Sequence, residues 1–207
     1  MDTSLKKEGR RWGNGDRTTE DLARQRIVAA ARTCYLRAGI NVTTMSQIAD
    51  EASVVRATLY RYFKTKQDVL RAVFYEEVKI FLEQFKAEQQ VYKGFCDYLL
   101  QFLLYSRQNA AETPIHQQFF SEDSAIWVSR EYLSDDSALG LTRDLFAEPF
   151  RIAQGTGEIR SDLSLDLLVE WLARILLSFI FVPEPQARSE DELVVLFETL
   201  LLRAIRV

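Results

Sequence analysis

Glycine, proline, cysteine and histidine are all scarce in this sequence of 207 residues, which has 8 Gly, 4 Pro, 2 Cys and 1 His. Because helix-breaking residues are few and alternating Val/Thr runs are rare, the sequence favours helices over strands. The low glycine and proline content, together with 47% hydrophobic residues, excludes a disordered or fibrous chain. We therefore expect an all-α globular protein.

The two cysteines and the single histidine lack the spacing of a metal site. Cys34 and Cys96 lie within apolar helical patterns, so we interpret them as buried, reduced thiols. His116 is interpreted either as a structural residue or as a hydrogen-bonding contact. No phosphate-binding loop, nucleophile elbow or HExxH motif occurs. We expect no metal, no cofactor, no catalytic residues and no enzymatic activity.

Long apolar runs are also missing. The longest, residues 175–182, is far shorter than the ~20 residues of a membrane-spanning helix, and Arg174 borders it. Residues 1–18 lack the apolar stretch of a secretory signal. These features predict a cytoplasmic protein with no membrane partner.

The net charge of −4 hides an uneven distribution along the chain. Residues 1–71 contain 14 basic and 8 acidic residues, whereas the remainder contains 12 basic and 22 acidic residues. A basic N-terminal third on an acidic body indicates that one end of the protein meets phosphate.

The first 18 residues are polar, basic and glycine-containing, and we interpret them as a flexible arm. This arm either reaches a DNA groove or backbone or is a disordered, solubilising tail. Its basic residues are Lys6, Lys7, Arg10, Arg11 and Arg17.

Helical periodicity begins at Thr19 and predicts a first helix that Gly39 ends. Thr44 and Gln47 have the spacing of a capping box and open a short second helix. A third helix is expected over 55–62 after a tight turn, and a long helix from the Thr65 cap to about residue 90. Further helices are expected over 91–108, 114–120, 124–133, 138–153, 165–182 and 190–205, with a loop over 154–163 and a capping box at Ser189 and Glu192.

Two short helices joined by a tight turn can place the second helix in a DNA major groove. At 100° per residue, placing Leu59 inward also places Phe63 inward and Val55 near it, so that Ala57, Arg61 and Lys64 face outward. Arginine suits guanine or phosphate, whereas tyrosine and lysine suit phosphate. An exposed helical hairpin of an all-α core would show the same spacing. The predicted DNA-binding residues are Thr44, Val55, Arg56, Ala57, Thr58, Tyr60, Arg61, Tyr62 and Lys66.

Residues 24–74 resemble the N-terminal domain of the TetR family of transcriptional regulators. The most specific feature is the string TLYRYFKTK, residues 58–66, which follows a helix ended by Gly39 and precedes Val69 and Leu70. Ser53 departs from the family pattern where a turn glycine is usual, and Val55 where a capping residue usually opens the recognition helix. Both departures leave the base preference open.

The resemblance implies an all-α architecture in which an N-terminal three-helix, helix-turn-helix domain is joined by a long helix to a helical ligand-binding and dimerisation domain. On this basis we expect a flexible arm over 1–18, a DNA-binding domain over 19–66 and an effector-binding and dimerisation domain over 67–207. It also implies that a small molecule relieves repression.

Apolar residues of the C-terminal part either line an effector cavity or form ordinary core. A cavity with this lining would hold an apolar or aromatic effector. The candidate effector-binding residues are Phe95, Tyr98, Leu99, Phe102, His116, Phe120, Trp127 and Trp171.

The last two predicted helices are apolar on more than one face and therefore need partners on more than one side. The resemblance implies that they form a homodimer interface, and a twofold dimer predicts a palindromic operator in double-stranded DNA. The candidate interface residues are Leu168, Leu172, Ile175, Phe179, Leu193, Leu196, Phe197 and Leu200. The alternatives are a DNA-binding regulator or architectural protein without a small-molecule switch, and an enzyme that uses a helical cavity.

Overall fold

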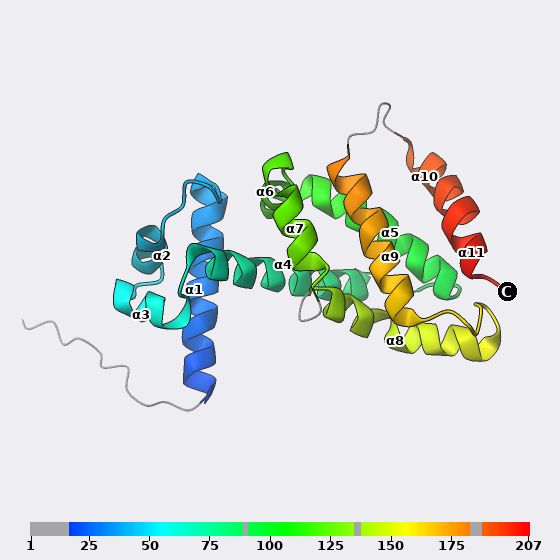
Figure 1. The fold of residues 1–207 in the computed structure, drawn as a ribbon, viewed down its shortest axis with the longest axis horizontal. Coiled ribbons are helices and arrows are strands. Elements are labelled where there is room, and N and C mark those ends of the chain that lie inside the picture. The colour runs from blue at the N-terminus through cyan, green and yellow to red at the C-terminus, as the bar shows by residue number, and fades with distance from the viewer. Residues whose placement is uncertain (1–16, 89–90, 135–137, 183–187) are drawn as a thin grey trace, which may run out of the picture.

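The computed structural model describes residues 17–88, 91–134, 138–182 and 188–207, and these ranges are helical without a named strand. The all-α prediction is confirmed. In Figure 1, three N-terminal helices lie at one end, and one long helix, α4, runs from them into a larger helical body. Of the expected basic arm, Lys6, Lys7, Arg10 and Arg11 lie outside the described residues, whereas Arg17 begins the first helix.

The N-terminal helices have the order expected of a helix-turn-helix domain. They are α1 Arg17–Ala38, α2 Met45–Glu51 and α3 Arg56–Tyr62, and α4 Lys66–Glu88 follows them. The body contains α5 Phe95–Glu112, α6 Pro114–Phe119, α7 Ala125–Tyr132, α8 Ala138–Thr156, α9 Leu165–Phe181, α10 Glu190–Phe197 and α11 Arg203–Ile205. A 3-10 turn at Glu122–Ser124 precedes α7, and a π-helical turn at Glu198–Leu202 joins α10 to α11.

Local capping explains where several of these helices begin. The Thr44 and Gln47 side chains form a reciprocal capping box at the start of α2, and Ser189 and Glu192 do the same for α10. At the start of α4, the Thr65 amide donates to the Asp68 carboxylate at 2.8 Å, and the Asp68 amide donates to the Thr65 hydroxyl at 3.1 Å. These predicted caps are confirmed.

The start of α5 differs from the prediction because a distant residue determines it. The helix begins at Phe95 rather than at residue 91, because the Glu158 carboxylate accepts hydrogen bonds from the Phe95 and Cys96 amides at 3.0 and 2.8 Å. Gly94 leaves room for this carboxylate, since a Cβ there would lie 2.7 Å from a Glu158 oxygen.

Two further boundaries differ from the sequence predictions. Helix α8 continues to Thr156, so the expected loop over 154–163 is shorter. The last helix is not continuous over 190–205, because the π-helical turn interrupts it.

One continuous apolar core runs through both parts of the protein, and α4 contributes to it along most of its length. Near the N-terminal helices, Val69 and Val73 are fully buried, and farther along the helix Phe85 is buried against Phe102. No helix within the described ranges is long and apolar enough to cross a membrane.

Candidate functional site

Contacts among α1, α2 and the following turn hold the helix-turn-helix in place. Arg37 of α1 forms an ion pair with Glu51 of α2 at 3.0 Å, and Arg26 donates to the Ala52 carbonyl at 3.3 Å. The buried Thr43 hydroxyl donates to the Gly39 carbonyl at 2.7 Å, which fixes the connection between α1 and α2. The short α2 therefore sits on a fixed support.

Ser53 occupies the left-handed backbone region in the turn between α2 and α3, with φ of 54°. The turn is closed by the Val54 amide, which donates to the Ala49 carbonyl at 2.9 Å. Serine thus adopts a conformation that favours glycine, at a cost of roughly 1 kcal/mol.

The sequence placed Val55 near the buried side of α3, and this placement is wrong. Val55 is 69% exposed because it lies before the helix, in an extended conformation, as an N-cap without a side-chain hydrogen bond. Helical phase does not apply to a residue outside the helix. Leu59 and Phe63 are buried as expected.

The outer face of α3 consists of basic, small and aromatic residues. These exposed residues are Arg56, Ala57, Tyr60 and Arg61, whereas Lys64, which the helical phase also placed outward, is exposed but follows the end of α3 at Tyr62. We call the set of Arg56, Ala57, Tyr60 and Arg61 the α3 face. Buried Leu59 anchors the same helix from behind, so a rigid core supports the exposed groups.

Three other predicted DNA-binding residues, Thr58, Tyr62 and Lys66, are half-buried and contact other parts of the protein. Thr58 and Tyr62 are half-buried and lie beside α1, and Arg61 stacks over the Tyr62 ring at 5.0 Å. The Lys66 ammonium donates to the Asn41 carbonyl at 2.9 Å, and burial lowers the pKa of Lys66. Thr44 is exposed at the start of α2.

A small internal cavity of about 60 Å³ lies between α4, α5, α6 and α9, with one wall from α7. Of the eight candidate effector-binding residues, only His116 and Phe120 line it. The remaining lining residues are Phe74, Glu77, Val78, Phe81, Ser106, Asn109, Ala110, Phe119, Tyr132, Ala173, Leu176, Leu177 and Ile180.

The other candidate effector residues pack elsewhere. Tyr98 and Phe102 fill space against Phe85 and Phe146, with ring centroids 4.9 to 5.7 Å apart, and Phe95 and Leu99 are equally buried. Trp127 packs on Phe74 and Phe119, whereas Trp171 is 44% exposed. The aromatic stripe of α5 is therefore core, and helical phase alone did not distinguish core from cavity.

The sequence analysis did not predict that Glu77 lines the cavity, because a single glutamate on a long helix gives no signal of burial. Glu77 of α4 is 3% exposed, and its carboxylate pairs with Arg32 of α1 at 2.5 and 3.4 Å. The His116 ring lies beside it, with Nε2 3.8 Å from the Glu77 carboxylate. Burial lowers the pKa of His116, while the charge of Glu77 opposes this shift.

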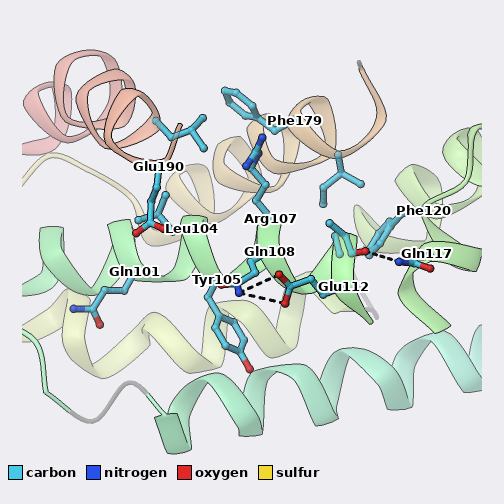
Figure 2. Close-up of a pocket in the computed structure, with 14 residues that line it drawn as sticks. Gln101, Leu104, Tyr105, Arg107, Gln108, Glu112, Gln117, Phe120, Phe179 and Glu190 are labelled. Atoms are coloured by element: carbon cyan, nitrogen blue, oxygen red, sulfur yellow. Dashed lines mark hydrogen bonds between the residues drawn. The ribbon is translucent and has the colours of Figure 1, made fainter. Parts of the chain in front are cut away.

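An open cleft of about 840 Å³ adjoins the cavity along α5, α6, α9 and α10 (Figure 2). The two spaces share the wall residues Ala110, Phe120 and Ile180. Polar side chains of the cleft include Gln101, Arg107, Gln108, Glu112, Gln117 and Glu190. The cleft thus leads from solvent to the apolar wall of the cavity.

Half of the candidate dimer residues lie in the chain's own core. Leu168, Leu172, Leu193 and Phe197 are buried within the chain, whereas Ile175, Phe179 and Leu196 are half-buried. Only Leu200 of the predicted set is exposed, at 65%. Both faces of these helices are apolar, and most of the candidate dimer residues lie on the face that packs into the chain's own core. The apolar residues that face outward on α9, α10 and the π-helical turn are Leu167, Trp171, Val195 and Leu200.

Comparison with known proteins identifies the N-terminal part. Residues 27–73 match the model of bacterial regulatory proteins of the tetR family. The chain is 36% identical over 86 residues to an HTH-type transcriptional regulator of Staphylococcus aureus strain RF122, and 35% identical to its counterpart in strain USA300. Each match covers 38% of this chain and 46% of the relative, so it spans about half the length of these relatives.

Solved structures share the fold over most of the chain. The transcriptional repressor QsdR of R. erythropolis, from the TetR family, is 23% identical with a TM-score of 0.64, covering 90% of this chain and 97% of that one. A TetR-family regulator of Pectobacterium atrosepticum is 20% identical with a TM-score of 0.66, covering 93% and 98%. At this identity the similarity concerns the fold alone.

Proposed function

We propose that this chain is a ligand-responsive transcriptional repressor of the TetR family that binds palindromic operator DNA as a homodimer in the cytoplasm, because residues 27–73 match that family and the fold of most of the chain resembles its solved members. The observation that carries this proposal is the α3 face: Arg56, Tyr60 and Arg61 are exposed on a helix that buried Leu59 packs against the core. An exposed helix with such groups fits a major groove about 12 Å wide.

Within the α3 face, Arg61 is the residue best suited to read a base. A guanidinium can make two hydrogen bonds to guanine or bind phosphate. Ala57 permits close approach or contacts a thymine methyl, while Tyr60 is suited to phosphate. Lys66 would exchange its bond to the Asn41 carbonyl for a phosphate. The exposed N-cap Val55 offers no hydrogen bond of its own.

The test is selection of bound fragments from a genomic DNA library, followed by affinity measurement on the enriched sequence. We expect a palindrome, and an Arg61→Ala, Tyr60→Phe double variant that binds it at least tenfold more weakly. Arg151→Ala is the matched control, because Arg151 is an exposed arginine of α8, far along the chain from α3. Failure to enrich a palindrome, or unchanged affinity of the double variant, would contradict the proposal.

The proposed dimer uses the outward apolar residues of α9, α10 and the π-helical turn. Large apolar side chains such as Leu167 and Leu200, both more than 60% exposed, favour burial against a second copy. A twofold arrangement places two α3 helices one DNA turn, ~34 Å, or more apart, which matches a palindromic site.

A regulator without a small-molecule switch is the second candidate, and the size of the cavity favours it. At about 60 Å³ the cavity is far smaller than the ~300–1,000 Å³ of common ligand sites. The surroundings of Phe102 are also filled by aromatic rings. Release of the operator by any compound in a metabolite screen would exclude this candidate.

A further inference from the structure

The internal cavity presents hydrogen-bond acceptors to any occupant. The Ser106 hydroxyl donates to the Phe102 carbonyl at 2.6 Å, so its lone pairs remain available. The Asn109 Oδ1 atom is buried and has no hydrogen-bond partner. The Glu77 carboxylate belongs to a residue that lines the same cavity, and His116 hydrogen-bonds to the Asn109 backbone. An occupant that donates hydrogen bonds would satisfy these acceptors.

Aromatic rings form much of the remaining wall. Phe74 and Phe119 meet edge to face at 5.2 Å, and Phe81 lies 6.5 Å from the His116 ring. The faces of such rings attract cations, and a nearby carboxylate strengthens this preference. Resting on the function proposed above, we propose that the effector is a small organic cation, an ammonium group on an apolar body, whose charge pairs with Glu77.

This occupant would compete with Arg32 for the same carboxylate. Arg32 belongs to α1, whereas Glu77 belongs to α4, so their ion pair joins the DNA-binding domain to the cavity wall. A buried carboxylate cannot remain unpaired at low cost, so one cation must replace the other. The Arg32 side chain is 41% exposed and can turn to water when it leaves. Effector binding would thereby remove a contact that holds α1 to α4.

The cleft offers a route and a place for the rest of the molecule. Ala110, Phe120 and Ile180 separate the cleft from the cavity, and Figure 2 shows Phe120 at one end of the cleft. A displaced Phe120 side chain would join the two spaces, so that the ammonium reaches Glu77 while the apolar body lies in the cleft.

Three probes of nearly equal size test the charge preference: benzylamine, benzyl alcohol and benzoate. Titration calorimetry on the full chain at pH 7 is expected to show benzylamine binding at least tenfold more tightly than either of the others. Glu77→Gln should remove this preference. The control Glu83→Gln makes the same change at an exposed position of α4 and should preserve it.

A second pair of variants guards against misfolding of the Glu77 variant. Asn109→Leu leaves the Arg32–Glu77 pair intact and should weaken benzylamine binding several-fold. Arg32→Gln removes the competing cation and should strengthen it. The proposal would be overturned if the three probes bound equally or if benzoate bound more tightly. It would also be overturned if the preference for benzylamine were unchanged in both the Glu77 and Asn109 variants.

The outcome is separable from that of the proposed function. Operator binding that another compound relieves, with no benzylamine preference, overturns the cation site alone. A benzylamine preference that depends on Glu77, in a protein that selects no DNA, supports the cation site and overturns the proposed function.

Discussion

The Gln118 side chain of α6 holds the end of α1 through both atoms of its amide: it donates to the Tyr35 carbonyl at 3.0 Å and accepts from the Ile40 amide at 3.1 Å. The Ile40 amide lies just beyond α1 and is satisfied by Gln118, whereas the Tyr35 carbonyl in the last turn of α1 also accepts from the amide of Gly39, which has a positive φ of 97°. Because α6 also carries His116, the same helix contacts both the cavity and the DNA-binding domain.

Gln118→Ala should lower the free energy of unfolding by about 1–3 kcal/mol, since it removes both bonds and leaves the part-buried Ile40 amide without this acceptor, while the Tyr35 carbonyl keeps its bond from the Gly39 amide at 2.8 Å. Urea denaturation followed by circular dichroism measures this loss. Gln84→Ala, at an exposed position of α4, is the control and should change stability by less than about 0.5 kcal/mol. Equal effects of the two substitutions would contradict the bridging role of Gln118.

The single histidine gives a clean test of pH dependence. Burial lowers the pKa of His116 below its ordinary value of 6.5, so the unfolded chain binds a proton at a higher pH than the folded chain does. The free energy of unfolding should therefore fall as the pH drops through 6.5, until the folded ring is also protonated. His116→Gln should lose less stability than the wild type between pH 7.5 and 5.5. A wild type that lost no more than the variant would refute the assignment.

Ser53→Gly should stabilise the protein by about 1 kcal/mol, because glycine adopts the positive φ of the turn without strain. Thermal unfolding would show a higher midpoint. Ser53→Ala is the matched control, since it retains a Cβ atom and should bring no such gain. The glycine variant also tests the interface: if operator affinity is unchanged, the serine hydroxyl takes no part in DNA binding.

Trp171→Glu places a charge on the outward face of α9 and should shift the proposed dimer to a monomer. Light scattering coupled to size-exclusion chromatography measures the change. Ile126→Glu, at an 80% exposed apolar position of α7, is the control and should leave the mass unchanged. A monomeric wild type would refute the dimer, and a dimeric Trp171→Glu variant would place its interface elsewhere.

Features decided by neighbouring residues could be predicted from the sequence. The capping boxes at Thr44 and Ser189 depend on side chains three residues away, and both occur as expected. The strained turn at Ser53 was likewise visible as a departure from a family pattern. The string of residues 58–66 indicated the fold because it combines the buried and exposed faces of α3.

Features decided across the chain could not be predicted in this way. The start of α5 depends on Glu158, more than 60 positions away, and the partner of Glu77 is 45 positions away in α1. Periodicity shows that a residue is apolar on one face, but it does not tell a filled core from a cavity. Phe102 and His116 were both candidate effector-binding residues. Tertiary packing places Phe102 in the core against Phe146 and places His116 at the cavity.

The unbroken course of α4 has a mechanical consequence. A helix of 23 residues is about 35 Å long, and Glu77 lies roughly 16 Å from its first residue. With Glu77 as a fulcrum, a tilt of 10° carries the N-terminal end through about 3 Å, nearly the 3.4 Å rise between base pairs. In the proposed dimer the two displacements would add, so the proposed exchange of cations at Glu77 would move both α3 helices out of register with the double helix.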